Sequence, residues 1–157
     1  MSEKEMSVEI FVEACRRKGL NVTYQRILIF KSLQRLKTHP SAEEIFRDVR
    51  NEYPAISLAT VYKTLETLSS EGLISVVNPL NDQARYDGNT SDHHHLVCGS
   101  CRKVVDIPHE FSPPIRLPEM AGHRVSGYRL LFEGICSDCR AEEPPRTAPS
   151  ETFCGKG

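Results

Sequence analysis

Four cysteines form two Cys-x-x-Cys pairs, Cys98/Cys101 and Cys136/Cys139. The two-residue spacer lets both thiolates of a pair point to the same side of a tight turn, and two such turns complete a tetrahedral four-thiolate site. A closed site of this kind is typical of structural zinc. A redox dithiol or two disulfides is the alternative, although a redox Cys-x-x-Cys normally occurs once and opens a helix after a strand. The spacing therefore favours one structural Zn²⁺ per chain.

A second group of potential metal ligands precedes the first cysteine pair. In the run Asp92–His95, an extended backbone places His93 and His95 on one face and His94 on the other. Two carboxylates and a third imidazole are further candidates: Asp87, Asp106 and His39. A nitrogen and oxygen set of this composition suits Fe(II), Mn(II) or Zn(II) rather than a thiophilic ion. Spacing alone does not connect His39 to the others, and a lone histidine is more often a surface or hydrogen-bonding residue.

The first seventy residues are predicted to form four helices, and a β-hairpin is predicted to follow them. Each helix has a hydroxyl residue in position to cap it: Ser7, Thr23, Ser41 and Ser57. Ser41–Glu44 has the sequence of a capping box. Two β-like segments, 73–77 and 84–86, flank the turn-rich segment 78–82. Short helices closed by a hairpin indicate a winged helix-turn-helix, in which one helix enters the major groove of DNA.

The helix behind Ser57 is the candidate DNA-reading helix. Its apolar residues repeat with helical period, and the remaining side chains are predicted to face outward: Thr60, Tyr62 at the flank, Lys63, Thr64 and Thr67. Such groups can contact phosphates, base edges and thymine methyls. The same pattern also fits an ordinary solvated face.

After residue 90 the pattern changes to short β-like segments at 103–107, 123–126 and 129–135. Prolines at positions 113, 114 and 118 leave room for little more than a short helix between them. The last residues are rich in Pro, Ser, Thr, Glu and Gly, which predicts a disordered tail over 141–157. The predicted fold class is α+β.

Composition is that of a globular protein. The 157 residues are 39% hydrophobic and 26% charged, without an apolar run long enough to cross a membrane or a signal-peptide pattern. Paired Cys-x-x-Cys motifs then suggest metal binding in a reducing cytoplasm. The net charge of −1 means that any contact with DNA depends on local placement of basic groups. Neither a nucleophile–base constellation nor a cofactor loop is found, so an enzyme is not expected. Cys15 reads as a core residue, and Cys154 is unassigned.

Two motifs together resemble the ferric uptake regulator (Fur) superfamily. Residues 57–63, Ser-Leu-Ala-Thr-Val-Tyr-Lys, are similar to its recognition-helix signature, and residues 92–106 are similar to its metal-binding signature. The resemblance covers about residues 8–140. It implies a homodimeric, metal-dependent repressor that binds double-stranded operator DNA. It further implies a winged-helix DNA-binding domain over 1–86, a hinge over 87–95, and a small α/β dimerisation and metal-binding domain over 96–140 that holds the zinc.

Within the superfamily the chain is most similar to the peroxide-sensing branch. Asp106 stands where the iron-responsive branch tends to carry Glu, and Tyr128 replaces a histidine of a further metal site. The resemblance implies regulatory Fe²⁺ or Mn²⁺ on five residues: His39, Asp87, His93, His95 and Asp106. With Fe(II), peroxide is expected to oxidise His39 or His93 and release DNA.

The DNA contacts implied are Arg26, Ser57, Thr60, Tyr62, Lys63 and Thr64, whereas Asn21 departs from the Lys or Arg of many relatives. An iron-responsive or other metal-responsive regulator of the same superfamily is the alternative. Two alternatives belong to other classes of protein: a zinc-ribbon redox protein that uses its Cys-x-x-Cys thiols, and a metal-storage module.

Overall fold

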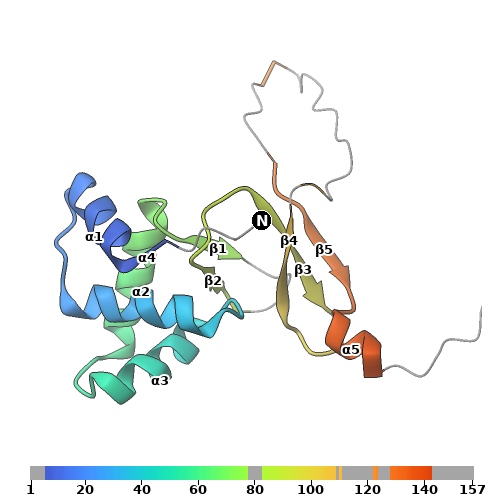
Figure 1. Ribbon diagram of the computed structural model, residues 1–157, viewed down its shortest axis with the longest axis horizontal. Helices are drawn as coiled ribbons and strands as arrows, with labels where there is room; N and C mark the ends of the chain where they lie inside the picture. Colours follow the sequence, from blue (N-terminus) through green and yellow to red (C-terminus); the bar gives the residue numbers. More distant parts are fainter. Residues whose placement is uncertain (1–5, 78–82, 109, 111–121, 124–127, 143–157) are drawn as a thin grey trace, which may run out of the picture.

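The computed structural model describes residues 6–77, 83–108, 110, 122–123 and 128–142 of the chain. These residues form a helical half and a sheet half, which Figure 1 shows side by side, connected through the segment after strand β2. Among the described residues, no helix is both long and apolar enough to cross a membrane. The predictions for 109, 111–121, 124–127 and 143–157, which include the three prolines and most of the tail, lie outside the described residues.

The helical half contains four helices, α1 (Val8–Arg17), α2 (Tyr24–Leu36), α3 (Ala42–Glu52) and α4 (Leu58–Ser70). Each begins after the hydroxyl residue predicted to cap it, and each of these side chains accepts a hydrogen bond from a backbone N–H of the first turn. The capping box of α3 is complete, because the Glu44 carboxylate also accepts from the Ser41 N–H at 2.7 Å. The local start signals were therefore correct for all four helices.

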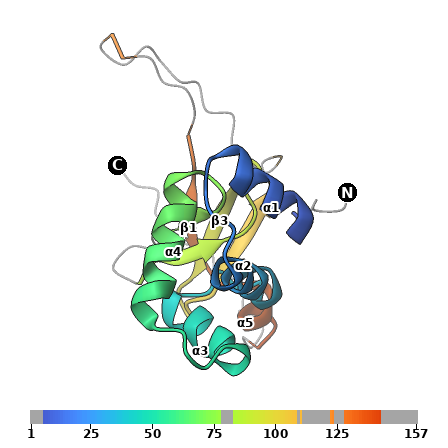
Figure 2. The same ribbon diagram turned by 90° about the vertical axis from the view of Figure 1, so that its left-hand side faces the viewer.

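One hydrophobic core holds these helices and the wing together. Phe11 of α1 stacks on Phe30 of α2, and both side chains are fully buried. Ile45 and Leu65 contribute the apolar faces of α3 and α4 to the same core. Figure 2 shows the helices grouped around this interior. The wing is the antiparallel pair β1 (Ser75–Val77) and β2 (Arg85–Asp87).

Strand β2 is attached to the helical half at two points that matter for the site. The Tyr86 N–H donates to the Pro40 carbonyl at 3.0 Å, and the Arg85 guanidinium donates to the Glu44 carboxylate at 2.8 Å. Because both partners lie in or beside the start of α3, the end of β2 and the α2–α3 connection are fixed relative to each other.

The sheet half is a three-stranded sheet of β4 (Val104–Pro108), β3 (His93–Cys98) and β5 (Leu131–Gly134), with β3 in the centre. Strand β3 pairs antiparallel with β4 and parallel with β5. Two side chains of this sheet, Val97 and Val104, form a small buried apolar cluster with Val77 of β1. The short helix α5 (Ser137–Glu142) follows β5.

One helix was not predicted, and two predicted segments overlap helices or strands. Helix α5 was not expected, and it includes Ala141 and Glu142, which the sequence assigned to a disordered tail from residue 141. The predicted hinge, 87–95, begins with the last residue of β2 and ends inside β3. The start of α5 is hard to recognise from the sequence, because the Cys-x-x-Cys spacing of residues 136–139 also suits a turn.

Candidate metal centre

Pairing between β3 and β5 explains how the two cysteine pairs meet. Cys98 ends β3 in register with Gly134, which ends β5, and the Gly99 N–H donates to the Gly134 carbonyl at 2.8 Å. Since the strands are parallel, both chains leave the sheet at the same edge. Cys101 follows in the β3–β4 turn, and Cys136 and Cys139 stand at the start of α5. The strands between the pairs thus bring all four thiols together.

The four thiols have the geometry of a zinc site. Their sulfurs all lie within 4.8 Å of one another, and Cys101 Sγ is 3.7 Å from Cys136 Sγ. A tetrahedral zinc with Zn–S bonds of about 2.3 Å separates its sulfurs by about 3.8 Å. All four cysteines are free, so they are not joined as disulfides. The residues therefore fit the structural Zn²⁺ that the spacing predicted.

Electrostatics at the thiols also favour a cation. Backbone N–H groups of Cys101 and Cys136 point at the Cys98 sulfur and lower the pKa of that thiol to about 6. Hydrogen bonding with the neighbouring Cys101 thiol raises the pKa of Cys139 to about 12. Four sulfurs packed this closely cannot all ionise unless a positive charge lies between them, and a zinc ion supplies that charge.

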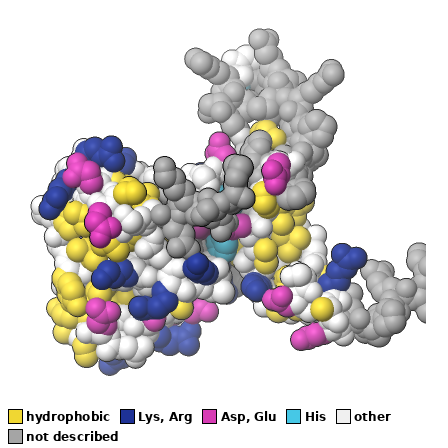
Figure 3. Space-filling model, in the orientation of Figure 1, with side chains coloured by type: hydrophobic (Ala, Val, Ile, Leu, Met, Phe, Trp, Pro, Cys, Tyr) yellow, Lys and Arg dark blue, Asp and Glu magenta, His cyan; other side chains and the backbone are white. Residues whose placement is uncertain are grey.

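The histidines and aspartates predicted as regulatory ligands also meet at one point, between the two halves of the molecule. His39 lies on the α2–α3 connection and Asp87 ends β2, both in the helical half. His93 and His95 lie on β3, and Asp106 lies on β4 directly opposite His95 in the sheet. Figure 3 shows histidine side chains in the crease between the halves. The sequence alone could not connect His39 to this group, whereas the fold does.

All three histidines direct Nε2 at the two carboxylates. His39 Nε2 is 2.8 Å from Asp106 Oδ1, and His93 Nε2 is 2.9 Å from Asp87 Oδ2. His95 Nε2 is 3.5 Å from each of these two oxygens. Metal–ligand bonds of about 2.1 Å place neighbouring ligands about 3 Å apart, so the separations fit one ion held by five ligands.

Hydrogen bonding supports the same conclusion. His39 Nε2, Asp87 Oδ2 and Asp106 Oδ1 are buried without a correctly directed hydrogen bond, although they lie close together. Buried polar atoms are rarely left in this state, because an unpaired one costs about 1–3 kcal/mol. Their lone pairs converge on a common centre instead. A divalent cation at that centre would satisfy all of them.

Surrounding groups fix the orientation of the ligands. His93 Nδ1 lies 2.8 Å from the Ser91 carbonyl and donates to it when Nε2 is the free nitrogen. Asp87 Oδ1 accepts from the Asn89 N–H at 2.7 Å, which leaves Oδ2 for the histidines. Such outer contacts set the tautomer and direction of metal ligands. His94 points to the other face, as predicted, where its ring stacks on Tyr128 and its Nδ1 accepts from the Leu130 N–H at 3.3 Å.

Without a metal, protons take the place of the ion in this cluster. Burial lowers the pKa of His39, but the neighbouring Asp106 and Asp87 carboxylates outweigh it and raise the pKa to about 9. The same carboxylates raise the pKa of His93 to about 10. Burial opposes ionisation of Asp87 and Asp106, yet the histidines hold the pKa of each carboxyl well below its usual range. A divalent ion must therefore displace protons from His39 and His93 when it binds at neutral pH.

Of the six predicted DNA contacts, five are at least partly accessible and one is not. Thr60, Tyr62 and Lys63 are exposed on α4, and the exposed Ser57 hydroxyl caps this helix. Arg26 is partly exposed and donates to the Asn21 carbonyl. Thr64 is only 9% exposed, which corrects the outward placement expected from sequence. Thr64 lies beside Val61 and Leu65, so the buried face of this helix is wider than its stripe of apolar residues.

Comparison with known proteins now identifies the family. A model described as the ferric uptake regulator family matches residues 17–116, which is more than half of the chain. The chain belongs to the ferric uptake regulator family. The superfamily resemblance seen in residues 57–63 and 92–106 is thereby confirmed.

Relatives of this family member include several named for peroxide. The peroxide operon regulator of Bacillus subtilis (strain 168) is 31% identical over 134 residues, which cover 84% of this chain and 92% of the relative. The peroxide-responsive repressor PerR of Staphylococcus aureus (strain Mu50 / ATCC 700699) is 30% identical over 138 residues, 87% of this chain and 93% of that protein.

Solved structures agree on the fold of this ferric uptake regulator family member. The Campylobacter jejuni peroxide stress regulator has a TM-score of 0.60 at 30% identity, covering 88% of this chain and all of that one. The Helicobacter pylori ferric uptake regulator, described as having three functional metal binding sites, has a TM-score of 0.67, covering 89% of this chain and 97% of that one. Its identity of 23% supports the fold alone.

Proposed function

We propose that this protein is a metal-dependent, DNA-binding transcriptional repressor that responds to peroxide through oxidation of His39 or His93. The observation that carries the proposal is the convergence of three histidines and two aspartates from both halves of the chain on one centre. Relatives named as peroxide regulators, similar over more than four fifths of the chain, support the peroxide branch. The role is regulatory rather than enzymatic.

The ligand geometry links metal binding to the arrangement of the two halves. His39 and Asp87 belong to the helical half, proposed as the DNA-binding domain over 1–86 with the 87–95 hinge. His95 lies on β3, at the end of the proposed hinge, and Asp106 lies on β4, in the dimerisation domain proposed over 96–140. Both strands belong to the sheet half. Ligands from both halves on one ion hold the halves in a single orientation. A shift from mostly open to mostly closed takes about 5.5 kcal/mol of differential affinity, which five ligands can supply.

The proposed operator contact is made by α4 in a homodimer on double-stranded DNA. Thr60, Tyr62 and Lys63 are exposed on this helix and can offer a methyl, a phenol and an ammonium. These groups can contact bases and phosphates in the major groove. Arg26 at the start of α2 is proposed to contact the backbone beside it. Action on DNA, with reduced thiols at the zinc site, fits a cytoplasmic protein.

The chemistry of sensing is assigned to the ligand side chains. Fe(II) held by these residues would supply the electron that reduces peroxide, whereas Mn(II) would not react readily. His39 and His93 each place a ring nitrogen at the centre that would hold this ion. In the net reaction, one peroxide oxygen is inserted at a ring carbon of either histidine, about +16 Da, and the other oxygen leaves as water. The oxidised ring is expected to be a weaker ligand, which loosens the link between the halves.

Operator release tests this function. A DNA duplex is first selected from a random library with the Mn(II)-loaded protein. We expect both the Fe(II)-loaded and the Mn(II)-loaded forms to bind it, and brief peroxide treatment to release only the Fe(II)-loaded form. If the Fe(II)-loaded form stays on the DNA, the iron-responsive alternative replaces the peroxide assignment.

Tyr62 provides a test of the reading helix. Its side chain is 44% exposed, and its hydroxyl donates to Glu43 at 2.6 Å, so removing the hydroxyl leaves the core unchanged. Tyr62→Phe is expected to weaken operator binding roughly two- to tenfold, the worth of one hydrogen bond at about 0.5–1.5 kcal/mol. The thermal midpoint should hardly change. Tyr53→Phe, which removes a hydroxyl from the end of α3, is the matched control, and equal affinities of both variants would exclude Tyr62 as a contact.

A further inference from the structure

The exposed side of α4 carries a phenol whose hydroxyl is already bonded within the protein. Tyr62 is 44% exposed, and its hydroxyl lies 2.6 Å from Oε1 of Glu43, a residue in the first turn of α3. Helices α3 and α4 pack on the same hydrophobic core, so the two side chains are presented by a fixed frame. The direction of this hydrogen bond determines which groups Tyr62 can bind on the outside.

The hydroxyl of Tyr62 is the donor in this bond. The hydroxyl and the backbone N–H of Glu43, at the start of α3, hold the pKa of the Glu43 carboxyl below its usual value. The carboxyl is therefore ionised at neutral pH, and an ionised carboxyl has only acceptor atoms. The same bond raises the pKa of Tyr62, so the phenol keeps its proton. Tyr62 must donate that proton to Glu43.

A phenol in this state offers only lone pairs to a second partner. A tyrosine hydroxyl has a single proton, and its oxygen can accept at the same time as it donates. Because the proton is directed at Glu43, any further hydrogen bond must be donated to the Tyr62 oxygen. In the major groove the donors are the exocyclic amino groups, N6 of adenine and N4 of cytosine, whereas O4 of thymine and O6 of guanine accept. Tyr62 is therefore matched to an amino group.

Charge also directs Tyr62 to a base rather than to a phosphate. Phosphate oxygens are negatively charged acceptors and have no proton to donate to the phenol. The ionised Glu43 carboxylate, hydrogen-bonded to the hydroxyl, repels a phosphate that approaches this point. Lys63, the next residue of α4, is exposed and carries only donors, which suits it to phosphates or to the acceptors of guanine. Neighbouring residues of the helix thus offer opposite hydrogen-bonding groups.

We propose that Tyr62 recognises an exocyclic amino group, on adenine or cytosine, at one base pair of each operator half-site. Glu43 is then a positioning residue, because it holds the hydroxyl proton away from the DNA and does not itself contact the bases. This inference rests on the proposed function, since it requires that α4 bind operator DNA. It adds the chemical group that one side chain of this helix reads.

Amino-deleted bases test the contact in the DNA duplex selected with the Mn(II)-loaded protein. Each adenine of a half-site is replaced in turn by purine, which lacks the N6 amino group, and each cytosine by pyrimidin-2-one, which lacks the N4 amino group. One replacement is expected to weaken binding of the parent about two- to tenfold, the worth of one hydrogen bond. Tyr62→Phe, already weaker by that factor, should lose nothing further from the same replacement.

Glu43→Ala tests the direction of the proton. At the base pair coupled to Tyr62, the parent should prefer the amino base over the keto base of the same ring size, adenine over guanine or cytosine over thymine, by about two- to tenfold. Without the carboxylate the hydroxyl can donate or accept, so Glu43→Ala should bind both bases within about twofold. A ratio of two affinities cancels the general effect of removing a negative charge. Glu52→Ala is the matched control, because Glu52 accepts from the Tyr24 hydroxyl at 3.1 Å in the same way, and it should keep the parent's preference.

Three results would overturn the inference: no amino deletion coupled to Tyr62→Phe, a coupled base that carries a keto group, or a parental preference in Glu43→Ala. Any of them with a selected duplex in hand leaves the proposed repressor function intact. If no duplex is selected at all, DNA binding itself fails, and this inference fails with it.

Discussion

Replacement of Cys98 by serine is expected to remove zinc from the protein and unfold its C-terminal sheet. Cys98 is fully buried, ends the central strand β3, and its sulfur accepts from the Cys136 N–H at 3.4 Å. A structural zinc contributes about 10–16 kcal/mol of apparent binding energy, and a serine hydroxyl does not replace a thiolate ligand. Metal analysis should fall from one zinc per chain to none.

The size of this effect follows from the weakness of the rest of the sheet. Its buried apolar cluster consists of Val97 and Val104 packed with Val77 of the wing, and these side chains supply little hydrophobic stabilisation compared with the core of the helical half. We expect circular dichroism to lose the strand contribution while α1–α4 remain folded. Cys154→Ser, outside both Cys-x-x-Cys pairs, is the control and should retain zinc. A Cys98→Ser protein that keeps its zinc and its sheet would contradict the assignment.

Replacement of His39 by alanine is expected to uncouple metal binding from DNA binding. His39 is 6% exposed and is one of two ligands from the helical half. Four ligands remain, so the ion still binds, but its affinity should fall about 100-fold or more. In the parent protein, a coupling of a few kcal/mol between Mn(II) binding and operator binding would raise operator affinity about 100-fold when Mn(II) is added. In His39→Ala this gain should fall below about tenfold.

The measurement is an operator titration at a fixed Mn(II) concentration that saturates both proteins. His123→Ala is the matched control, because His123 is exposed and lies outside the cluster. Zinc content and the thermal midpoint should be unchanged in both variants. If His39→Ala retained full Mn(II)-dependent DNA binding, the ion would not act by linking the two halves.

Local signals in the sequence were sufficient for much of this fold. Ser7, Thr23, Ser41 and Ser57 cap helices where predicted, because a capping hydroxyl acts within one turn and needs no distant partner. The cysteine pairs were equally readable, since a two-residue spacer alone determines which way both sulfurs point.

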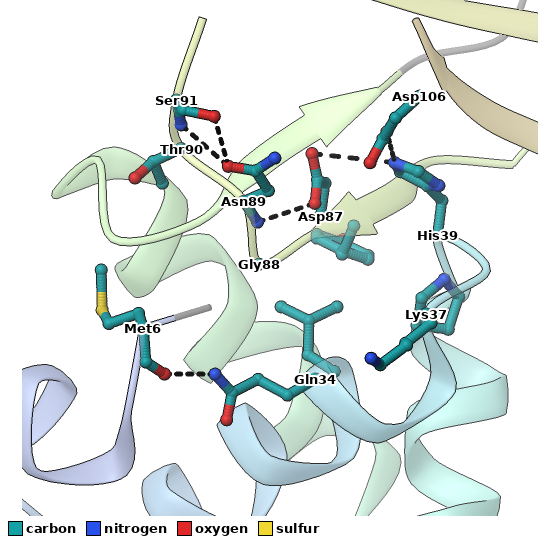
Figure 4. A pocket seen from close by; sticks show the side chains of 13 residues that line it. Met6, Gln34, Lys37, His39, Asp87, Gly88, Asn89, Thr90, Ser91 and Asp106 are labelled. Atoms are coloured by element: carbon teal, nitrogen blue, oxygen red, sulfur yellow. Dashed lines mark hydrogen bonds and ion pairs between the residues drawn. The ribbon is translucent and has the colours of Figure 1, made fainter. Parts of the chain in front are cut away.

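What the sequence could not provide depends on contacts between distant segments. The residues alone did not connect His39 to the cluster, which requires the Tyr86–Pro40 hydrogen bond and the positive φ of His39. A cavity lined by His39, Asp87 and Asp106 (Figure 4) depends on the same connection and was not predicted. Burial of Thr64 was missed because a period-based pattern marks the centre of a buried face better than its edge.

The central claim is that peroxide is sensed at the histidine and aspartate cluster and not at the cysteines. Peptide mass spectrometry of the Fe(II)-loaded, zinc-containing protein after brief peroxide treatment tests this most directly. We predict a +16 Da shift on a peptide containing His39 or His93, absent from the Mn(II)-loaded protein, with zinc retained and all four zinc-site thiols reduced. Disulfide formation among Cys98, Cys101, Cys136 and Cys139 with zinc loss, and no oxidised histidine, would contradict the account.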